Sequence, residues 1–233
     1  MTRRTLAVVS AGLSQPSSTR LLADQLAAAT RDELVRRGSE VELRVVDLRE
    51  YAHDVVNNML TGFAPAALRD VIDTVTGADG IIAVTPIFSA SYNGLFKSFF
   101  DVLDSESLVD RPVLIGATGG TARHSLALEH AVRPMFAYLR SVVVPTAVFA
   151  APEDWSGGTA DGALRGRIRR AAGELADQVE RRLPAAGPAD PFALTTDFLQ
   201  MLGRGDDDAA VTPPGRTGAP PAPDSARAGS PPG

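Results

Sequence analysis

A hydroxyl-rich segment at residues 10–20, SAGLSQPSSTR, has the composition of an anion-binding loop. It follows a short apolar run and precedes a segment with helical spacing, so its backbone N–H groups lie at the positive end of a helix dipole. A terminal phosphate has three exposed oxygens, which several hydroxyl and N–H donors and one cation can bind together. The candidate phosphate ligands are Ser10, Gly12, Ser14, Ser17, Ser18, Thr19 and Arg20.

The glycine content of this loop separates two classes of nucleotide. A bridging pyrophosphate is usually bound by a GxGxxG run, whose glycines allow close backbone approach, and this loop lacks that run. The loop therefore favours a mononucleotide with a terminal phosphate, such as FMN. The alternative is an ordinary Ser/Thr-rich loop in which Thr19 caps the following helix.

A second segment, TPIFSASYNGLFK at residues 85–97, joins an apolar run to an amphipathic one. Pro86 lacks an N–H group and ends the strand, so the main chain that follows is free to face a ligand. Backbone groups suit the polar rim of a flat heteroaromatic ring, and apolar side chains shield its faces. The candidate ring ligands are Thr85, Pro86, Ile87 and Phe88. The aromatic residues from Tyr92 onward are expected in the core or a subunit interface.

A third segment, GATGGTARHS at residues 116–125, contains two adjacent glycines after an apolar run. Gly119 and Gly120 allow the backbone to approach a ligand closely, and their N–H groups suit a ring carbonyl that gains negative charge. Thr118 belongs to the same candidate group. Arg123 is a candidate ligand for a phosphate or ribose, and equally a partner for a surface carboxylate. His124 more often caps or packs than reacts.

The apolar periodicity predicts five strands alternating with helices. Continuous apolar runs are typical of parallel strands that helices cover on both faces. This alternation predicts an α/β fold, a flavodoxin-like doubly wound five-stranded parallel sheet in the order 2-1-3-4-5. The expected strands are Thr5–Ser10, Val41–Asp47, Gly80–Thr85, Pro112–Ala117 and Val142–Phe149, and the expected helices are Thr19–Arg37, Pro65–Thr76, Tyr92–Leu103, Arg123–Leu139 and Gly162–Leu183.

The composition excludes several classes of function. The net charge of -5 provides no cationic surface for nucleic acid or anionic lipid. No apolar run is long enough for a membrane span, and the N-terminus lacks the apolar core of a secretory signal, so a cytoplasmic protein is expected. The chain has no cysteine, and its three histidines are not spaced as metal ligands, so no metal site is expected.

The C-terminal part of the chain differs in composition. Residues 203–233 contain seven prolines and six glycines and almost no large apolar side chains, which is typical of disorder. The sequence therefore predicts a domain at 1–185, a C-terminal extension at 186–202 with a possible short helix, and a disordered tail at 203–233.

The three segments together resemble those of the NADPH-dependent FMN reductase family, in particular the branch that partners luciferase-like monooxygenases. The resemblance runs from about Thr5 to Leu183 and includes the run REYAHDVVNNMLTGF. It implies that the first loop holds the FMN phosphate, that the second lies along the isoalloxazine ring, and that the third contacts the pyrimidine end. The run IFSAS replaces a YNGS-like run that many relatives carry, which leaves quinone or azo-dye specificity open.

The resemblance implies a flavin reductase that uses NADPH or NADH as hydride donor and passes reduced FMN to a partner monooxygenase. Because the flavin supplies the chemistry, no catalytic side chain is expected, and the relevant donors are main-chain groups near Ile87 and Phe88. Such reductases are usually homodimers or homotetramers. The alternatives are an NAD(P)H:quinone or azo reductase that retains FMN, and a flavodoxin-like electron carrier. A phosphoacceptor signalling domain is disfavoured, because Ser10 and Thr85 stand where that class needs acids.

Overall fold

The computed structural model describes residues 2–156 and 159–182. Within these residues the chain forms a seven-stranded sheet in the order β2-β1-β3-β5-β6, with β4 paired to β3 and β7 paired to β5. All pairings are parallel except that of β3 with β4. The strands are β1 (Arg3–Ser10), β2 (Glu40–Asp47), β3 (Gly80–Phe88), β4 (Ser91–Tyr92), β5 (Pro112–Thr118), β6 (Val142–Val143) and β7 (Val148–Ala150).

The predicted doubly wound parallel sheet and its order are confirmed, with two differences. The short antiparallel β4 was not predicted. The predicted strand Val142–Phe149 is broken into β6 and β7, because Pro145 lies between them and cannot donate to the ladder. The Glu174 carboxylate accepts hydrogen bonds from the Thr146 backbone N and Oγ1, both at 2.7 Å, and so satisfies the interrupted backbone.

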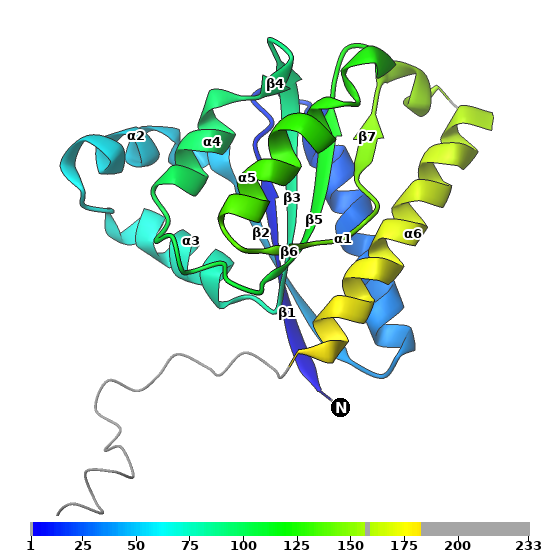
Figure 1. The fold of residues 1–233 in the computed structure, drawn as a ribbon, viewed down its shortest axis with the longest axis horizontal. Coiled ribbons are helices and arrows are strands. Elements are labelled where there is room, and N and C mark those ends of the chain that lie inside the picture. The colour runs from blue at the N-terminus through cyan, green and yellow to red at the C-terminus, as the bar shows by residue number, and fades with distance from the viewer. Residues whose placement is uncertain (1, 157–158, 183–233) are drawn as a thin grey trace, which may run out of the picture. The chain divides into compact units, whose positions relative to one another are not determined.

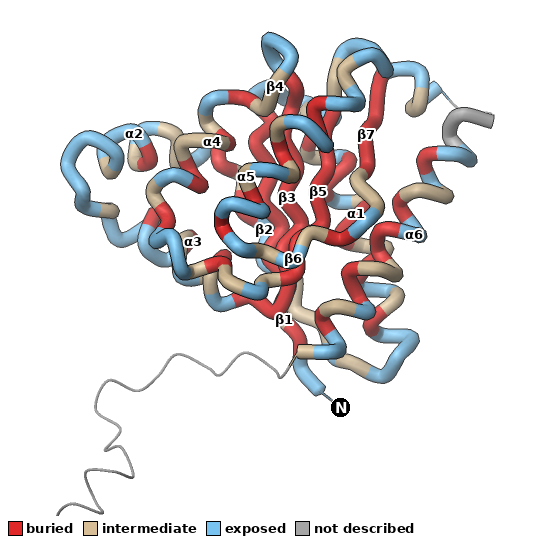
Figure 2. Tube along the Cα trace, viewed as in Figure 1, coloured by how far each residue is buried: buried red, intermediate tan, exposed pale blue. Residues whose placement is uncertain are grey.

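Helices cover both faces of the sheet, as continuous apolar strands require. One apolar cluster joins the sheet to α1 and α6, and the other joins it to α2–α5 (Figure 1). Figure 2 shows the central strands β1, β3 and β5 buried along most of their length. The helices are α1 (Ser18–Arg36), α2 (Ala52–Thr61), α3 (Ala66–Gly77), α4 (Gly94–Asp101), α5 (Arg133–Tyr138) and α6 (Thr159–Arg181).

The helix predicted at Arg123–Leu139 begins only at Ala127 and is not a regular α-helix. A short 3₁₀ turn at Ala122–His124 and a π-helical turn at Leu128–Val132 precede α5, which holds only the last part. Pro134 lacks the N–H group that would bond four residues back, so an α-helix cannot run through it undisturbed. The helix predicted at Tyr92–Leu103 begins instead at Gly94, since Tyr92 belongs to β4. The helix α2 was not predicted.

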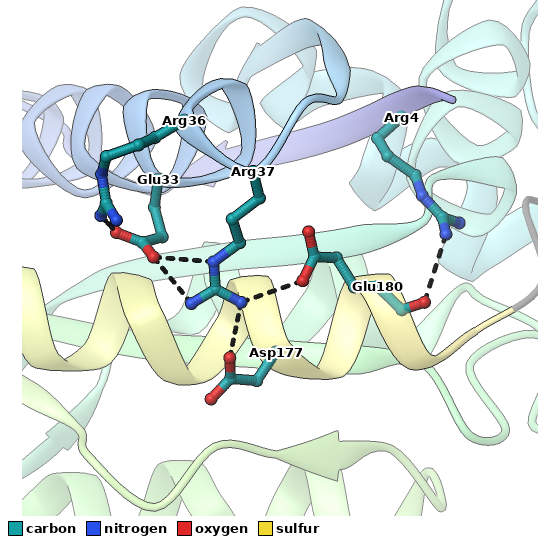
Figure 3. Close-up of polar contacts among 6 residues, drawn as sticks. All are labelled: Arg4, Glu33, Arg36, Arg37, Asp177 and Glu180. Atoms are coloured by element: carbon teal, nitrogen blue, oxygen red, sulfur yellow. Dashed lines mark hydrogen bonds and ion pairs between the residues drawn. The ribbon is translucent and has the colours of Figure 1, made fainter. Parts of the chain in front are cut away.

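Two arginines join α6 to the rest of the domain. Arg37 follows α1 and bonds to Glu33 on α1 and to Asp177 and Glu180 on α6 (Figure 3). Arg4 on β1 is buried and donates to the Glu180 and Arg182 carbonyls at the end of α6. Its guanidinium also pairs with Asp79 at 3.3 Å, and both side chains are only 6% exposed.

Several predictions lie outside the described residues. They include the C-terminal extension at 186–202 and the tail at 203–233. No helix in the described ranges is long and apolar enough to cross a membrane. The homodimer or homotetramer expected from the sequence stays a prediction.

Candidate functional site

The three predicted loops lie side by side at one edge of the sheet. Strands β1, β3 and β5 are adjacent and parallel, and Ser10, Val84 and Gly116 lie in one row of the register. Their carboxyl ends therefore meet at the same edge, where doubly wound folds bind ligands. The structure thus brings together the segments that follow Ser10, Phe88 and Thr118.

A buried asparagine connects the first two loops. Asn93 is 2% exposed, and its Nδ2 donates to the Ala11 carbonyl at 2.8 Å. Its Oδ1 accepts from the Phe96 backbone N at 2.7 Å, which caps α4. Its backbone N donates to Thr85 Oγ1 at 3.2 Å. Sequence reasoning left Asn93 out of the candidate set, although an asparagine before a helical run is a recognisable capping signal.

A pair of threonines connects the first and third loops. The Oγ1 atoms of Thr19 and Thr118 lie 2.8 Å apart, and both residues are buried. Thr85 is also fully buried, and its hydroxyl donates to the Pro86 carbonyl at 3.0 Å. These three hydroxyls therefore hold the loops in position, and in this structure they point into the protein rather than toward a ligand.

Replacing Asn93 with alanine is expected to destabilise the domain by about 2–3 kcal/mol, because it leaves the Ala11 carbonyl and the Phe96 N–H unpaired in the interior. The measurement is urea unfolding of the two proteins. Asn93→Ser is the matched control, because serine keeps a helix-capping oxygen but lacks the amide donor to Ala11. We expect it to lose less stability than the alanine variant, and an equal loss would show that the cap contributes little.

The first loop has the geometry of a helix N-terminus. Ser17 caps α1, with its Oγ accepting from the Arg20 backbone N at 3.2 Å, so the alternative in which Thr19 is the cap is wrong on this point. Gly12 lies against this cap, because a Cβ atom there would overlap Ser17 Oγ. The side chains of Ser14 and Ser18 are exposed. The loop thus presents hydroxyls and unpaired N–H groups at the start of a helix.

Ser10 and Arg20 differ in their surroundings. The Ser10 hydroxyl is buried at the end of β1 and has no hydrogen-bond partner among the residues that the structure describes. A buried polar group without a partner is uncommon and requires an explanation. Arg20 pairs with Asp24 at 2.8 Å and lies 4.0 Å from Asp47, which ends β2. The candidate cation therefore has two carboxylates near its guanidinium.

The second loop is a tight hairpin between β3 and β4. Ser89 and Ala90 have φ angles of 49° and 66°, a left-handed conformation that favours glycine or asparagine. The Ile87 side chain is buried, and Phe88 is 50% exposed. A turn that is strained at both central residues is typical of functional sites. Phe88 therefore remains available at the surface beside the turn.

The two glycines of the third loop have different roles. A Cβ atom on Gly119 would lie 2.8 Å from the ring of Phe149, so this position needs glycine for packing. A Cβ atom on Gly120 would meet open space. Only Gly120 therefore leaves room for a ligand to approach. Arg123 is exposed, and its guanidinium forms no ion pair with any described residue.

Metal chemistry has no geometric support in the part of the chain that the structure describes. No group of three or more His, Asp or Glu side chains there could hold a metal ion. The groups that could bind a ligand at the carboxyl edge of the sheet are therefore hydroxyl, amide and main-chain groups.

Comparison with characterised proteins identifies relatives over most of this domain. The chain is 36% identical to a protein of Pseudomonas aeruginosa named FMN reductase (NADPH), over 70% of this chain and 86% of the relative. It is 33% identical to the NADH-dependent FMN reductase SfnE of Pseudomonas putida, over 77% of this chain and 90% of the relative. The two relatives are named for different coenzymes.

A solved structure and a family model agree with these relatives. An oxidoreductase from Corynebacterium diphtheriae has a TM-score of 0.76 and 45% identity, covering 78% of this chain and 100% of its own. The family model for NADPH-dependent FMN reductases matches residues 4–156, which include all three loops. The chain therefore belongs to the NADPH-dependent FMN reductase family of oxidoreductases.

Proposed function

We propose that this protein reduces FMN with NAD(P)H and delivers the reduced flavin to a partner monooxygenase. The main observation behind the proposal is that buried hydrogen bonds join the three loops. Asn93 and the Thr19–Thr118 pair form these bonds. Such a frame holds a binding edge in one geometry before the ligand arrives, which lowers the entropy lost on binding.

The residues at this edge fit FMN. The unpartnered Ser10 hydroxyl and the N-terminus of α1 suit a terminal phosphate. The space in front of Gly120 admits a flat ring, and the exposed Phe88 provides an apolar contact. Ser10, Ser14, Ser17, Ser18 and Arg20 would hold the phosphate, and the main chain at residues 85–88 and 118–120 would hold the ring.

When bound, FMN supplies the redox chemistry, accepting a hydride at N5 from C4 of the nicotinamide. The chain's own contribution is binding and orientation. Main-chain N–H groups of the second and third loops would donate to the polar rim of the ring and stabilise negative charge there. Phe88 would exclude water beside the turn. Neither the stabilisation of charge on the ring nor the exclusion of water needs a side-chain acid or base.

The proposal is tested by NADPH or NADH oxidation in the purified protein with and without added FMN, measured under anaerobic conditions. We expect oxidation to depend on FMN and one FMN to be reduced for each coenzyme consumed. Absence of coenzyme oxidation with excess FMN would indicate an electron carrier instead. Ping-pong turnover with quinones and little release of reduced FMN would indicate a quinone reductase.

Delivery to a monooxygenase rests on the resemblance of the three loops to the branch that partners luciferase-like enzymes. It is tested by coupling the reductase to such a monooxygenase across a dialysis membrane and in direct mixture. Product formation in the mixture requires release of reduced FMN. No product, with normal FMN reduction, would contradict the delivery step alone.

A further inference from the structure

A cleft lies beside the third loop, and none of its lining residues is among the FMN contacts given under the proposed function. Its volume is about 330 Å³, within the lower range of small-molecule sites. Ala90 from the strained hairpin forms one side, and Ala127 and Leu126 provide apolar surface. The remaining polar lining comes from Arg123, His124 and His130.

The polar lining of this cleft is basic. The Arg123 guanidinium has no carboxylate partner within the described residues. The Nδ1 atom of His124 is buried and has no hydrogen-bond partner in the described part of the chain. The chain as a whole carries a net charge of -5, so an unpaired cation in a cleft is a local exception that attracts anions.

The acidic residue Glu129, next to the cleft residue His130 in the chain, does not cancel this charge. Glu129 lies next to His130 in the chain, but both of its carboxylate oxygens bond to Arg133, at 2.5 and 3.0 Å. The hydrogen bond from Arg133 lowers the pKa of Glu129 below its ordinary value, against the opposing effect of burial. The Glu129 charge is therefore already compensated by Arg133.

We propose that this cleft binds the 2′-phosphate end of NADPH and that Arg123, with His124, makes the protein prefer NADPH to NADH. The inference rests on the proposed function, since it assigns the coenzyme of that reaction. NADPH differs from NADH only by a dianionic phosphate on the adenosine ribose. An arginine fork and an imidazole donor match three phosphate oxygens, and the apolar wall formed by Leu126 and Ala127 suits the adenine.

The position of the cleft agrees with the length of the coenzyme. Ala90 belongs to the hairpin beside the ring-binding strand, and His124 Cβ lies 3.6 Å from the Cβ position of Gly119. The cleft therefore borders both loops assigned to the ring. A nicotinamide stacked on that ring must extend its diphosphate and adenosine over neighbouring protein surface, and this cleft is a basic surface that adjoins the loops.

The first test measures binding without turnover. FMN-loaded protein is titrated calorimetrically with 2′,5′-ADP and with 5′-AMP, which lacks the discriminating phosphate. We expect the wild-type protein to bind 2′,5′-ADP at least ten-fold more tightly than 5′-AMP, and Arg123→Gln to abolish most of this difference. Equal affinity of the wild-type protein for the two nucleotides would overturn the proposal. An equal loss of FMN affinity in the variant would also overturn it, because Arg123 would then belong to the flavin site.

The second test measures selectivity during turnover. The ratio of kcat/KM for NADPH to that for NADH is expected to fall about ten-fold in Arg123→Gln. Arg31→Gln is the matched control, because Arg31 is exposed on α1 and pairs with Asp32. We expect it to leave the ratio unchanged. Equal losses with both coenzymes in Arg123→Gln would refute the phosphate role. Failure of the proposed function would instead appear as no oxidation of either coenzyme, and the binding test would still decide the role of the cleft.

Discussion

Replacing Gly12 with alanine is expected to weaken FMN binding at least ten-fold. The new Cβ atom would overlap Ser17 Oγ and lie 3.1 and 3.2 Å from the Cβ atoms of Ser17 and Thr19. The loop must then move away from the start of α1, with loss of the Ser17 cap. Loss of one charge-assisted hydrogen bond to the phosphate costs about 1.5–3 kcal/mol, and each 1.4 kcal/mol corresponds to a ten-fold change in Kd.

The measurement is the quenching of FMN fluorescence on titration with protein. Gly173→Ala is the control, because Gly173 lies in α6 and a Cβ atom there meets open space. This change is expected to leave FMN affinity unaltered and to stabilise the helix by about 0.5–1 kcal/mol. The double variant Gly12→Ala with Ser17→Gly removes the overlapping atoms and is expected to recover part of the affinity. Unaltered FMN binding in Gly12→Ala would show that the phosphate lies elsewhere.

Replacing Arg4 with methionine is expected to destabilise the domain by about 3–5 kcal/mol, the usual effect of removing one partner of a buried ion pair. Methionine keeps the apolar stem but leaves the Asp79 carboxylate without the Arg4 guanidinium in the interior. The Thr5 backbone N still donates to Asp79 at 2.8 Å, which offsets only part of the loss. The Glu180 and Arg182 carbonyls at the end of α6 also lose their donor.

The measurement is the free energy of unfolding from urea titration. The matched control is Arg3→Met on the same strand, because the Arg3 side chain is 66% exposed and pairs with Glu42 at the surface. An exposed pair contributes about 0–1 kcal/mol, so this variant should lose little stability. Equal losses in the two variants would indicate that burial of the Arg4–Asp79 pair has no special effect on stability.

The sequence was sufficient for the sheet and for the edge at which the three candidate loops meet. Continuous apolar runs identify central parallel strands, and parallel strands direct all their carboxyl ends to one edge. The loops after Ser10, Phe88 and Thr118 therefore had to meet there. Apolar periodicity gave wrong element bounds where a single proline changes the backbone. Pro145 interrupts the last predicted strand, and Pro134 disturbs the predicted helix.

The roles of individual loop residues could not be predicted in this way. The Thr19–Thr118 pair joins residues 99 positions apart, and Asn93 reaches Ala11 across 82 positions. Gly119 and Gly120 are identical neighbours in the sequence, yet only the first packs against Phe149. These distinctions arise from contacts between distant segments, which the local spacing of residues does not encode.

The sequence by itself thus determined the fold, the edge and the chemical character of each loop. Only the tertiary structure decided which hydroxyls turn inward to hold the loops, which glycine leaves room for a ring, and that Arg123 lies unpaired in a cleft with two histidines. The physical reason is that periodicity reports which face of an element is buried, whereas hydrogen bonds and close packing depend on what the chain brings against that face.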